Sequence, residues 1–251
     1  KCYLQLSFIS ATKGEWNKNL EYIDQVKQIF DILNYKDGLF LIYENKAIAY
    51  SGIFEYDRAI DYLNLVIKRK EIDSTKSSLA SVYNNASYLY GLTGNYKTAY
   101  KYASLSYKIA EQINDKRLMC NPLLTIGRNY FFKKNYEQAL DYFNKSLKLQ
   151  AEIKSKFHEI PLLTNVWIAL CYKFISKEYN VNIIHDLIKE CPNIPYNINY
   201  RIYQLLEDTS YLETAYNQVQ EKADNLKPDV AAKFLSYPIP KAIVEEWEKV
   251  K

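Results

Sequence analysis

A column of small polar side chains recurs along the sequence at every fortieth position. Its members are Gln5, Asn45, Asn85, Thr125 and Asn165. An asparagine side chain offers two N–H donors and one acceptor oxygen, so it can bond to the backbone of an extended peptide without reading the peptide's side chains. The alternative is structural, because the same amide could bond to a neighbouring helix of the protein itself. Either use requires helices that present the column on one surface.

Residue patterns typical of catalysis are absent from the sequence. It contains no GxxxxGK[ST], GxGxxG or HExxH motif. The two histidines, His158 and His185, have no partnered cysteine pattern, so each is interpreted as an exposed or internally satisfied helical residue. Carboxylates scatter along polar helix faces, where they are typical of solvated positions. We therefore expect no enzyme activity, no catalytic residue, no metal site and no cofactor.

Composition favours an ordinary folded protein that contacts neither nucleic acid nor a membrane interior. Hydrophobic residues make up 48% of the 251 residues, and 33 basic against 29 acidic side chains are interspersed along the chain. No apolar run reaches the roughly 18 residues of a membrane span. The four cysteines form no CxxC, which is typical of free thiols in a reducing compartment. A cytoplasmic location is expected, with a removed signal or a lipid attached to Cys2 as the alternative.

Two further motifs repeat with the same step of forty residues. Each unit has an aromatic residue followed three positions later by alanine, and an earlier segment with a small residue followed three positions later by tyrosine. Apolar residues in both segments recur at spacings of three and four, which indicates amphipathic helices, and short polar breaks separate them. Each unit is therefore predicted to be a hairpin of two antiparallel helices. The repeated positions are Tyr56, Tyr96 and Tyr136 before Ala59, Ala99 and Ala139, and Ala47, Ser87 and Gly127 before Tyr50, Tyr90 and Tyr130.

The small residues have a packing explanation. Two closely packed helices need a small side chain where their axes approach, so we expect Gly127 and Ala139 to face each other within one hairpin. A single hairpin cannot cover its own apolar faces, and neighbouring hairpins must therefore stack.

These motifs resemble the tetratricopeptide repeat family, whose pattern reads here as Leu123, Ile126-Gly127, Tyr130, Ala139 and Phe143. The usual period of about 34 residues is lengthened to 40 and the family's closing proline is missing, which is similar to members with longer helices. The resemblance implies an all-α, right-handed superhelical solenoid of antiparallel helix hairpins with a C-terminal capping segment. The single predicted domain, 1–251, has repeats at about 1–39, 40–79, 80–119, 120–159, 160–195 and 196–226 and a capping tail at 227–251. The tail also resembles the end of repeat arrays attached to bacterial signalling proteins.

In this family the first helix of each hairpin lines the concave face, so the resemblance places the polar column in a groove. Aromatic residues there could hold a ligand's side chains and Arg128 could hold a carboxylate, although a solvated or locally paired arginine is the alternative. The expected peptide-binding residues are Gln5, Asn45, Asn84, Asn85, Tyr88, Asn121, Thr125, Arg128, Phe132 and Asn165.

Three functions remain open from the sequence. The first is a protein-interaction module that binds a peptide or a partner's helix and belongs to a larger signalling or regulatory protein. The second is a sensor for a short signalling peptide, coupled to an attached effector domain. The third is a structural spacer or an oligomerisation scaffold with no ligand in the groove, and in the second case the protein would form a homo-oligomer.

Overall fold

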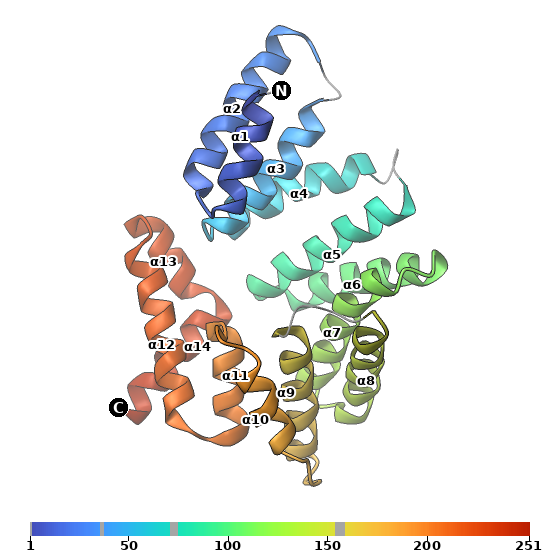
Figure 1. Ribbon diagram of the computed structural model, residues 1–251, viewed down its shortest axis with the longest axis vertical. Coiled ribbons are helices and arrows are strands. Elements are labelled where there is room, and N and C mark those ends of the chain that lie inside the picture. Colours follow the sequence, from blue (N-terminus) through green and yellow to red (C-terminus); the bar gives the residue numbers. More distant parts are fainter. Residues whose placement is uncertain (1, 36–37, 71–74, 154–158) are drawn as a thin grey trace.

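The computed structural model describes residues 2–35, 38–70, 75–153 and 159–251, which form helices and turns and contain no strand. Consecutive helices pack as hairpins that stack along a curved path, and the C-terminal helices return toward the N-terminal hairpins (Figure 1). The predicted all-α solenoid of helix hairpins is thus confirmed. The helices are α1 (Cys2–Thr12), α2 (Trp16–Ile32), α3 (Gly38–Gly52), α4 (Tyr56–Lys70), α5 (Lys76–Leu92), α6 (Tyr96–Gln112), α7 (Lys116–Phe132), α8 (Tyr136–Glu152), α9 (Glu159–Phe174), α10 (Asn182–Lys189), α11 (Tyr196–Leu206), α12 (Thr209–Asp224), α13 (Pro228–Ser236) and α14 (Pro238–Val250).

The turns explain why the repeat is so regular. A left-handed residue allows the last carbonyls of a helix to accept hydrogen bonds from the turn. After α7, for example, the Asn135 backbone N–H donates to the Tyr130 carbonyl at 3.0 Å, and the Asn135 side chain caps α8 by accepting from the Gln138 N–H at 3.2 Å. Helix and turn together therefore occupy twenty residues, and two such units make the period of forty. The backbone takes a positive φ at Gly14, Asn34, Phe54, Gly94, Asn114 and Lys134.

Repeated side-chain contacts hold the two helices of each hairpin together. A tyrosine late in the first helix stacks on a tyrosine of the second helix, with ring centroids 5.4–5.7 Å apart. The pairs are Tyr50–Tyr62, Tyr90–Tyr102 and Tyr130–Tyr142. The tyrosine column of the sequence is thus part of the packing within the hairpins.

The small residue of the fourth hairpin faces a ring and not an alanine. A β-carbon on Gly127 would stand 2.6 Å from Cε1 of Phe143, and the three atoms nearest to that position all belong to Phe143. Phe143 is fully buried, so its ring has no room to retreat. The close contact expected between Gly127 and Ala139 is therefore made by Phe143, one turn further along α8.

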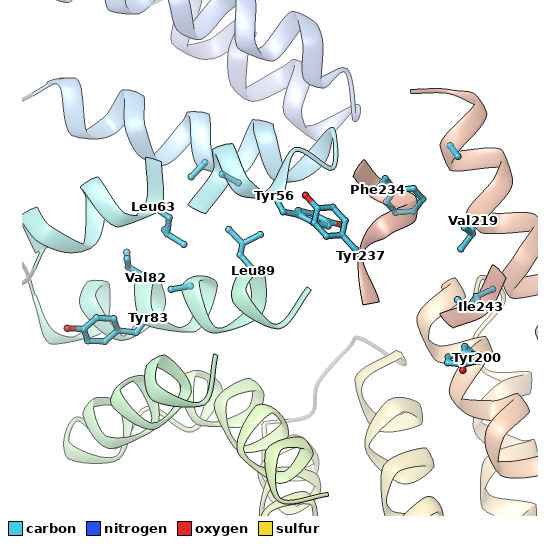
Figure 2. Packing of buried hydrophobic residues seen from close by; sticks show 14 of the residues in the cluster. Tyr56, Leu63, Val82, Tyr83, Leu89, Tyr200, Val219, Phe234, Tyr237 and Ile243 are labelled. Atoms are coloured by element: carbon cyan, nitrogen blue, oxygen red, sulfur yellow. The ribbon is translucent and has the colours of Figure 1, made fainter. Parts of the chain in front are cut away.

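The C-terminal segment contacts the turn between α3 and α4. Phe234 of α13 packs on Phe54, with ring centroids 4.9 Å apart. Tyr237 packs on Tyr56, and Figure 2 shows these two rings together. Lys233 Nζ adds an ion pair with Asp57 Oδ2 at 2.9 Å. Phe54 makes its contact from a left-handed conformation with φ 63°, which costs a residue with a β-carbon about 1–2 kcal/mol. The end of the solenoid thereby returns to its second hairpin and encloses part of the inner face.

Candidate functional site

The enclosed part of the inner face contains a cavity of about 530 Å³. The helices α5, α6, α7 and α9 line it together with Tyr56 of α4, and α11 and the start of α14 complete the wall. A cavity of roughly 300–1,000 Å³ is typical of small-ligand sites. The aromatic side chains of its walls are Tyr56, Tyr88, Tyr96, Tyr100, Phe132, Trp167, Tyr196 and Tyr237. The cationic residues at the cavity are Lys97, Arg128, Lys133 and Arg201, and no Asp or Glu is among the described residues that line it.

Two arginines of this cavity lie beside the same indole ring. The guanidinium carbon of Arg201 is 4.8 Å from the centroid of a Trp167 ring, and that of Arg128 is 5.6 Å away. Arg201 is buried and donates from Nη1 to Oε1 of Gln204 at 2.5 Å, whereas Arg128 is half-buried beside the cavity. Among the described residues, neither arginine has an ion-pair partner.

The surroundings of the two arginines disfavour their charge without removing it. Burial lowers the pKa of Arg128. Burial also lowers the pKa of Arg201 to about 10, and repulsion from the Arg128 charge contributes to the shift. Both guanidinium groups remain protonated at neutral pH, so the cavity is a concentrated positive site.

Buried polar atoms without hydrogen-bond partners gather at this cavity. Within the described residues they are Ser87 Oγ, Asn129 Oδ1, Trp167 Nε1 and Tyr237 Oη, and all four residues line it. The Tyr237 hydroxyl does lie near the backbone amides at the start of α4, and burial raises the pKa of Tyr237 to about 12. The remaining three atoms have no such neighbour, and buried polar groups of native proteins are normally bonded. These atoms lie just beneath the cavity surface, so a ligand would bond to them after a local shift of the cavity wall.

Two further cavities continue the hollow on either side of Tyr88, which lines all three. One of about 670 Å³ lies along α3 and α5 and is lined by Asn45, Ile48 and Asn85. The other, of about 940 Å³, extends toward the turn before α11. The three cavities meet at Tyr88 and form a groove lined by the first helices together with residues of the second helices α2, α4, α6 and α12.

The structure brings six of the ten predicted peptide-binding residues to this groove. Asn45, Asn85 and Tyr88 line the cavity along α3 and α5, while Tyr88, Thr125, Arg128 and Phe132 line the enclosed cavity. Gln5 borders a separate shallow depression on α1. Asn84 is half-buried on α5 and Asn121 is exposed on α7, and neither lines the three cavities.

Asn165, the last member of the polar column, bonds within the protein. Its Nδ2 donates to the Pro161 carbonyl at 2.9 Å, and its Oδ1 accepts from the Tyr179 hydroxyl at 3.1 Å. Asn45 similarly donates to the Leu41 carbonyl at 2.7 Å. Asn85 is exposed on the groove. The polar column therefore includes amides that bond within the protein, as in Asn45 and Asn165, and an amide that is exposed on the groove, as in Asn85. The sequence alone had left both uses open.

Several residues of the enclosed cavity were not predicted, above all Trp167, Asn129, Arg201 and Tyr237. One signal was available for Trp167, because it occupies the position that holds a small residue in the three preceding repeats. A large ring there means that the fifth hairpin packs differently, and its second helix, α10, has only eight residues. Arg201 and Tyr237 lie where the repeat pattern is lost, so no spacing identified them.

The described residues contain no group of three or more His, Cys, Asp or Glu side chains that could hold a metal ion. No helix in the described part of the chain is long and apolar enough to cross a membrane. Cys120, Cys171 and Cys191 are buried free thiols, and burial raises the pKa of Cys120 to about 11 and that of Cys171 to about 12. These thiols are therefore protonated and poorly nucleophilic at neutral pH.

The fold and groove define a helical-hairpin solenoid of the tetratricopeptide type. The tetratricopeptide repeat family model matches residues 78–152, so these central hairpins are tetratricopeptide repeats. The hairpins on both sides continue the same architecture. Tetratricopeptide repeats generally mediate protein–protein interaction. No curated protein is significantly similar to the chain in sequence.

Solved structures share this fold over nearly the whole chain. The apo form of RapI is 13% identical with a TM-score of 0.67, and the match covers 98% of both chains. A Rap protein complexed with Competence and Sporulation Factor is 14% identical with a TM-score of 0.57, covering 99% of this chain and 64% of that one. A signal transduction ATPase with a tetratricopeptide repeat sensor, from Pyrococcus horikoshii, is 17% identical with a TM-score of 0.62. The match covers 98% of this chain and 36% of that one. At these identities the likeness concerns the fold.

Proposed function

We propose that this chain is a binding module that holds an extended peptide segment along the inner face of the solenoid. The observation that carries the proposal is the groove of three cavities that meet at Tyr88. Its first-helix walls provide amides and aromatic rings, the two kinds of group that bind a peptide backbone and its side chains. One protein of similar fold is complexed with a factor named for competence and sporulation, which is compatible with this use of the architecture.

Exposed apolar side chains support the same location. Ile48 and Tyr88 occupy equivalent positions of consecutive repeats on the groove, and their side chains are 53% and 60% exposed. Phe132 lies one turn after Arg128 and is 44% exposed. Large apolar side chains gathered on a concave surface are typical of binding sites. A bound peptide would cover these three residues, while the exposed amide of Asn85 would bond to its backbone.

A second candidate function is ligand sensing coupled to an attached effector domain. The specific observation is the narrow contact between the C-terminal segment and the second hairpin, made by Phe234 with Phe54 and by Tyr237 with Tyr56. A ligand in the enclosed cavity would contact both the C-terminal segment and the second hairpin. Its binding would therefore stabilise the conformation in which these two parts of the chain are in contact. A structure of similar fold belongs to an ATPase with a tetratricopeptide repeat sensor.

The test is selection of binders from a displayed library of random dodecapeptides, followed by fluorescence anisotropy with the selected peptides. The groove variant Asn85→Ala/Tyr88→Ala should lose at least about tenfold in affinity, because it removes a backbone contact and an aromatic contact. Asn144→Ala is the matched control, since Asn144 is an exposed amide on α8, a second helix outside the groove. Both variants should keep the melting temperature of the unaltered protein.

The outcomes separate the candidates. Loss of binding in the groove variant alone supports the module, and a smaller radius of gyration with peptide bound favours sensing. Equal binding by both variants would place the site elsewhere, and failure to select any peptide would favour a spacer.

A further inference from the structure

We propose that Arg128 and Arg201 together bind an acidic side chain, Asp or Glu, of the peptide that lies in the groove. This inference rests on the proposed peptide-binding function and names the chemistry that the ligand must carry. The enclosed cavity would hold the acidic side chain beside the indole of Trp167, between the first helices and α11.

The charges of the cavity favour an anion. Burying a cation without a partner is costly, and the buried cation Lys46 elsewhere in the chain is paired with Asp24 at 2.7 Å. Arg128 and Arg201 are instead close enough to repel each other, and no Asp or Glu lines their cavity among the described residues. A carboxylate between them would offset both the repulsion and the loss of hydration.

The hydrogen-bonding groups of the cavity match a carboxylate on a peptide. A guanidinium group has five N–H donors, and Arg201 uses one of them on Gln204. The buried Nε1–H of Trp167 and the hydroxyl of Ser87 have no partner, and a local shift of the cavity wall on binding would let them donate to carboxylate oxygens. Oδ1 of Asn129 also has no partner and, after such a shift, would accept from a backbone N–H of the same peptide.

The position of the arginine pair favours a side chain over a chain end. The cavity along α3 and the cavity toward α11 both meet the arginine cavity at Tyr88. A peptide that occupies these two neighbouring cavities therefore runs past Tyr88, and a side chain from within its sequence can enter the arginine cavity.

Stacking on aromatic rings does not by itself explain the two arginines. Arg201 lies over Trp167 and also over Phe132 and Tyr200, with its guanidinium carbon 5.8 Å and 5.4 Å from the last two ring centroids. Each such contact gains about 0.5–2 kcal/mol, but none supplies the negative charge that would offset the penalty of several kcal/mol for burying an unpaired ion. One guanidinium over the ring would satisfy the packing, and a methionine or leucine would do so without charge. The second arginine increases the free-energy cost of burying unpaired positive charge. This arrangement is expected of a site that binds an anion.

The experiment uses three mixtures of ten-residue peptides, randomised over uncharged residues and acetylated at the N-terminus. The first has an amidated C-terminus and no carboxylate. The second is the same with one central position fixed as Glu. The third has no acidic side chain but a free C-terminal carboxylate. Each is incubated with the protein, and the peptides that co-elute on gel filtration are identified by mass spectrometry and titrated by calorimetry.

The protein variants are Arg128→Gln, Arg201→Gln and Arg128→Lys, with Arg117→Gln as the matched control. Arg117 is an exposed arginine on α7, the helix that also carries Arg128. Each glutamine variant should bind the Glu peptides at least about tenfold more weakly, because it removes a charged hydrogen-bonding group. Arg128→Lys should fall between Arg128→Gln and the unaltered protein, and it remains informative if a glutamine variant fails to fold.

Retention of the Glu mixture by the unaltered protein and by Arg117→Gln, with loss in the glutamine variants, supports the inference. Preferential retention of the free C-terminus mixture would overturn it in favour of recognition of a chain end. Equal binding of all three mixtures, unaffected by the arginine changes, would overturn the anion site and leave the peptide groove standing. Binding of no mixture by any variant would overturn the inference and the proposed function together.

Discussion

The ring of Tyr237 packs against the ring of Tyr56 with centroids 4.8 Å apart, joining the C-terminal segment to the second hairpin. Both rings line the enclosed cavity, and Figure 2 shows them side by side at the point where the two parts of the chain meet. Phe234 and Lys233 add contacts from the preceding helix, α13. The cavity exists because a long-range contact brings α11 and α14 opposite α5, α7 and α9.

Tyr237→Ala should weaken this closure. Tyr237 is 5% exposed, and removal of a large buried ring costs about 3–5 kcal/mol of unfolding free energy. We expect a lower midpoint in urea and a larger radius of gyration by small-angle X-ray scattering. Lys233→Ala is the comparison, because its ion pair with Asp57 is exposed and should contribute less than about 1 kcal/mol. Equal effects of the two changes would contradict the importance of the ring contact.

Gly127→Val should destabilise the protein by roughly 1–3 kcal/mol through overpacking against Phe143. Gly91→Ala provides a control in α5, because the nearest atom to its added β-carbon would be the Ala99 β-carbon at 4.0 Å, an ordinary contact. That change should be neutral or stabilising by up to about 1 kcal/mol, since alanine favours a helix. Thermal unfolding measures the stability of both variants. An unchanged melting temperature for Gly127→Val would count against the observed packing.

Asn85 and Asn165 should behave differently although they occupy the same repeat position. Asn85→Ala should leave the unfolding free energy within about 0.5 kcal/mol, because the side chain is exposed. Asn165→Ala should cost about 1–3 kcal/mol, because the partly buried Tyr179 hydroxyl loses its acceptor. Chemical denaturation of the two variants tests the difference, and a larger loss for Asn85→Ala would assign it a structural role.

Arg201→Met should reduce binding of acidic peptides without reducing stability. The change removes a buried unpaired cation while keeping an apolar chain against Trp167, so we expect the unfolding free energy to stay within about 1 kcal/mol or to rise. Melting temperature and peptide affinity are both measured. A loss of several kcal/mol would instead show that Arg201 is held by interactions essential to the fold.

Binding of a glutamate peptide should change little between about pH 6 and pH 8.5. Arg201 stays protonated in this window because its lowered pKa is about 10, and a glutamate carboxyl, with a pKa near 4.3, stays ionised. Affinity should fall as the pH drops through the carboxyl pKa and the ligand becomes neutral. A phosphoserine peptide would instead weaken as the pH falls through about 6, where it loses its second charge. Calorimetric titration across this range distinguishes the two.

The residue type that would give the most stable fold at position 201 thus differs from the one that would bind an anionic ligand. An apolar side chain at position 201 would remove the cost of a buried cation, whereas arginine provides the charge for a ligand. Locally unfavourable choices of this kind are typical of functional sites. Phe54 in its left-handed conformation is a second example, since its ring makes the contact with Phe234 that closes the cavity.

The sequence by itself determined the hairpins, their twenty-residue half-repeats and the first-helix position of Asn45 and Asn85. These features depend on local rules, namely apolar spacing, capping side chains and turn residues, which act within one hairpin and repeat along the chain. The sequence predicted a close contact of Gly127 with the second helix, and the atoms nearest to its missing β-carbon belong to Phe143, because helix spacing alone does not fix which side chain of α8 fills the gap. The amide of Asn165 bonds internally because its neighbour Tyr179 belongs to a hairpin that departs from the repeat.

Only the tertiary structure decided that Arg128 meets Arg201 and that Trp167, Asn129 and Tyr237 share their cavity. These residues come from hairpins far apart in sequence, and the last of them lie where the forty-residue rhythm has been lost. Their meeting depends on the summed curvature of the stacked hairpins and on the packing of Tyr237 against Tyr56. Curvature accumulates from small rotations at every interface, which no spacing of residue types records.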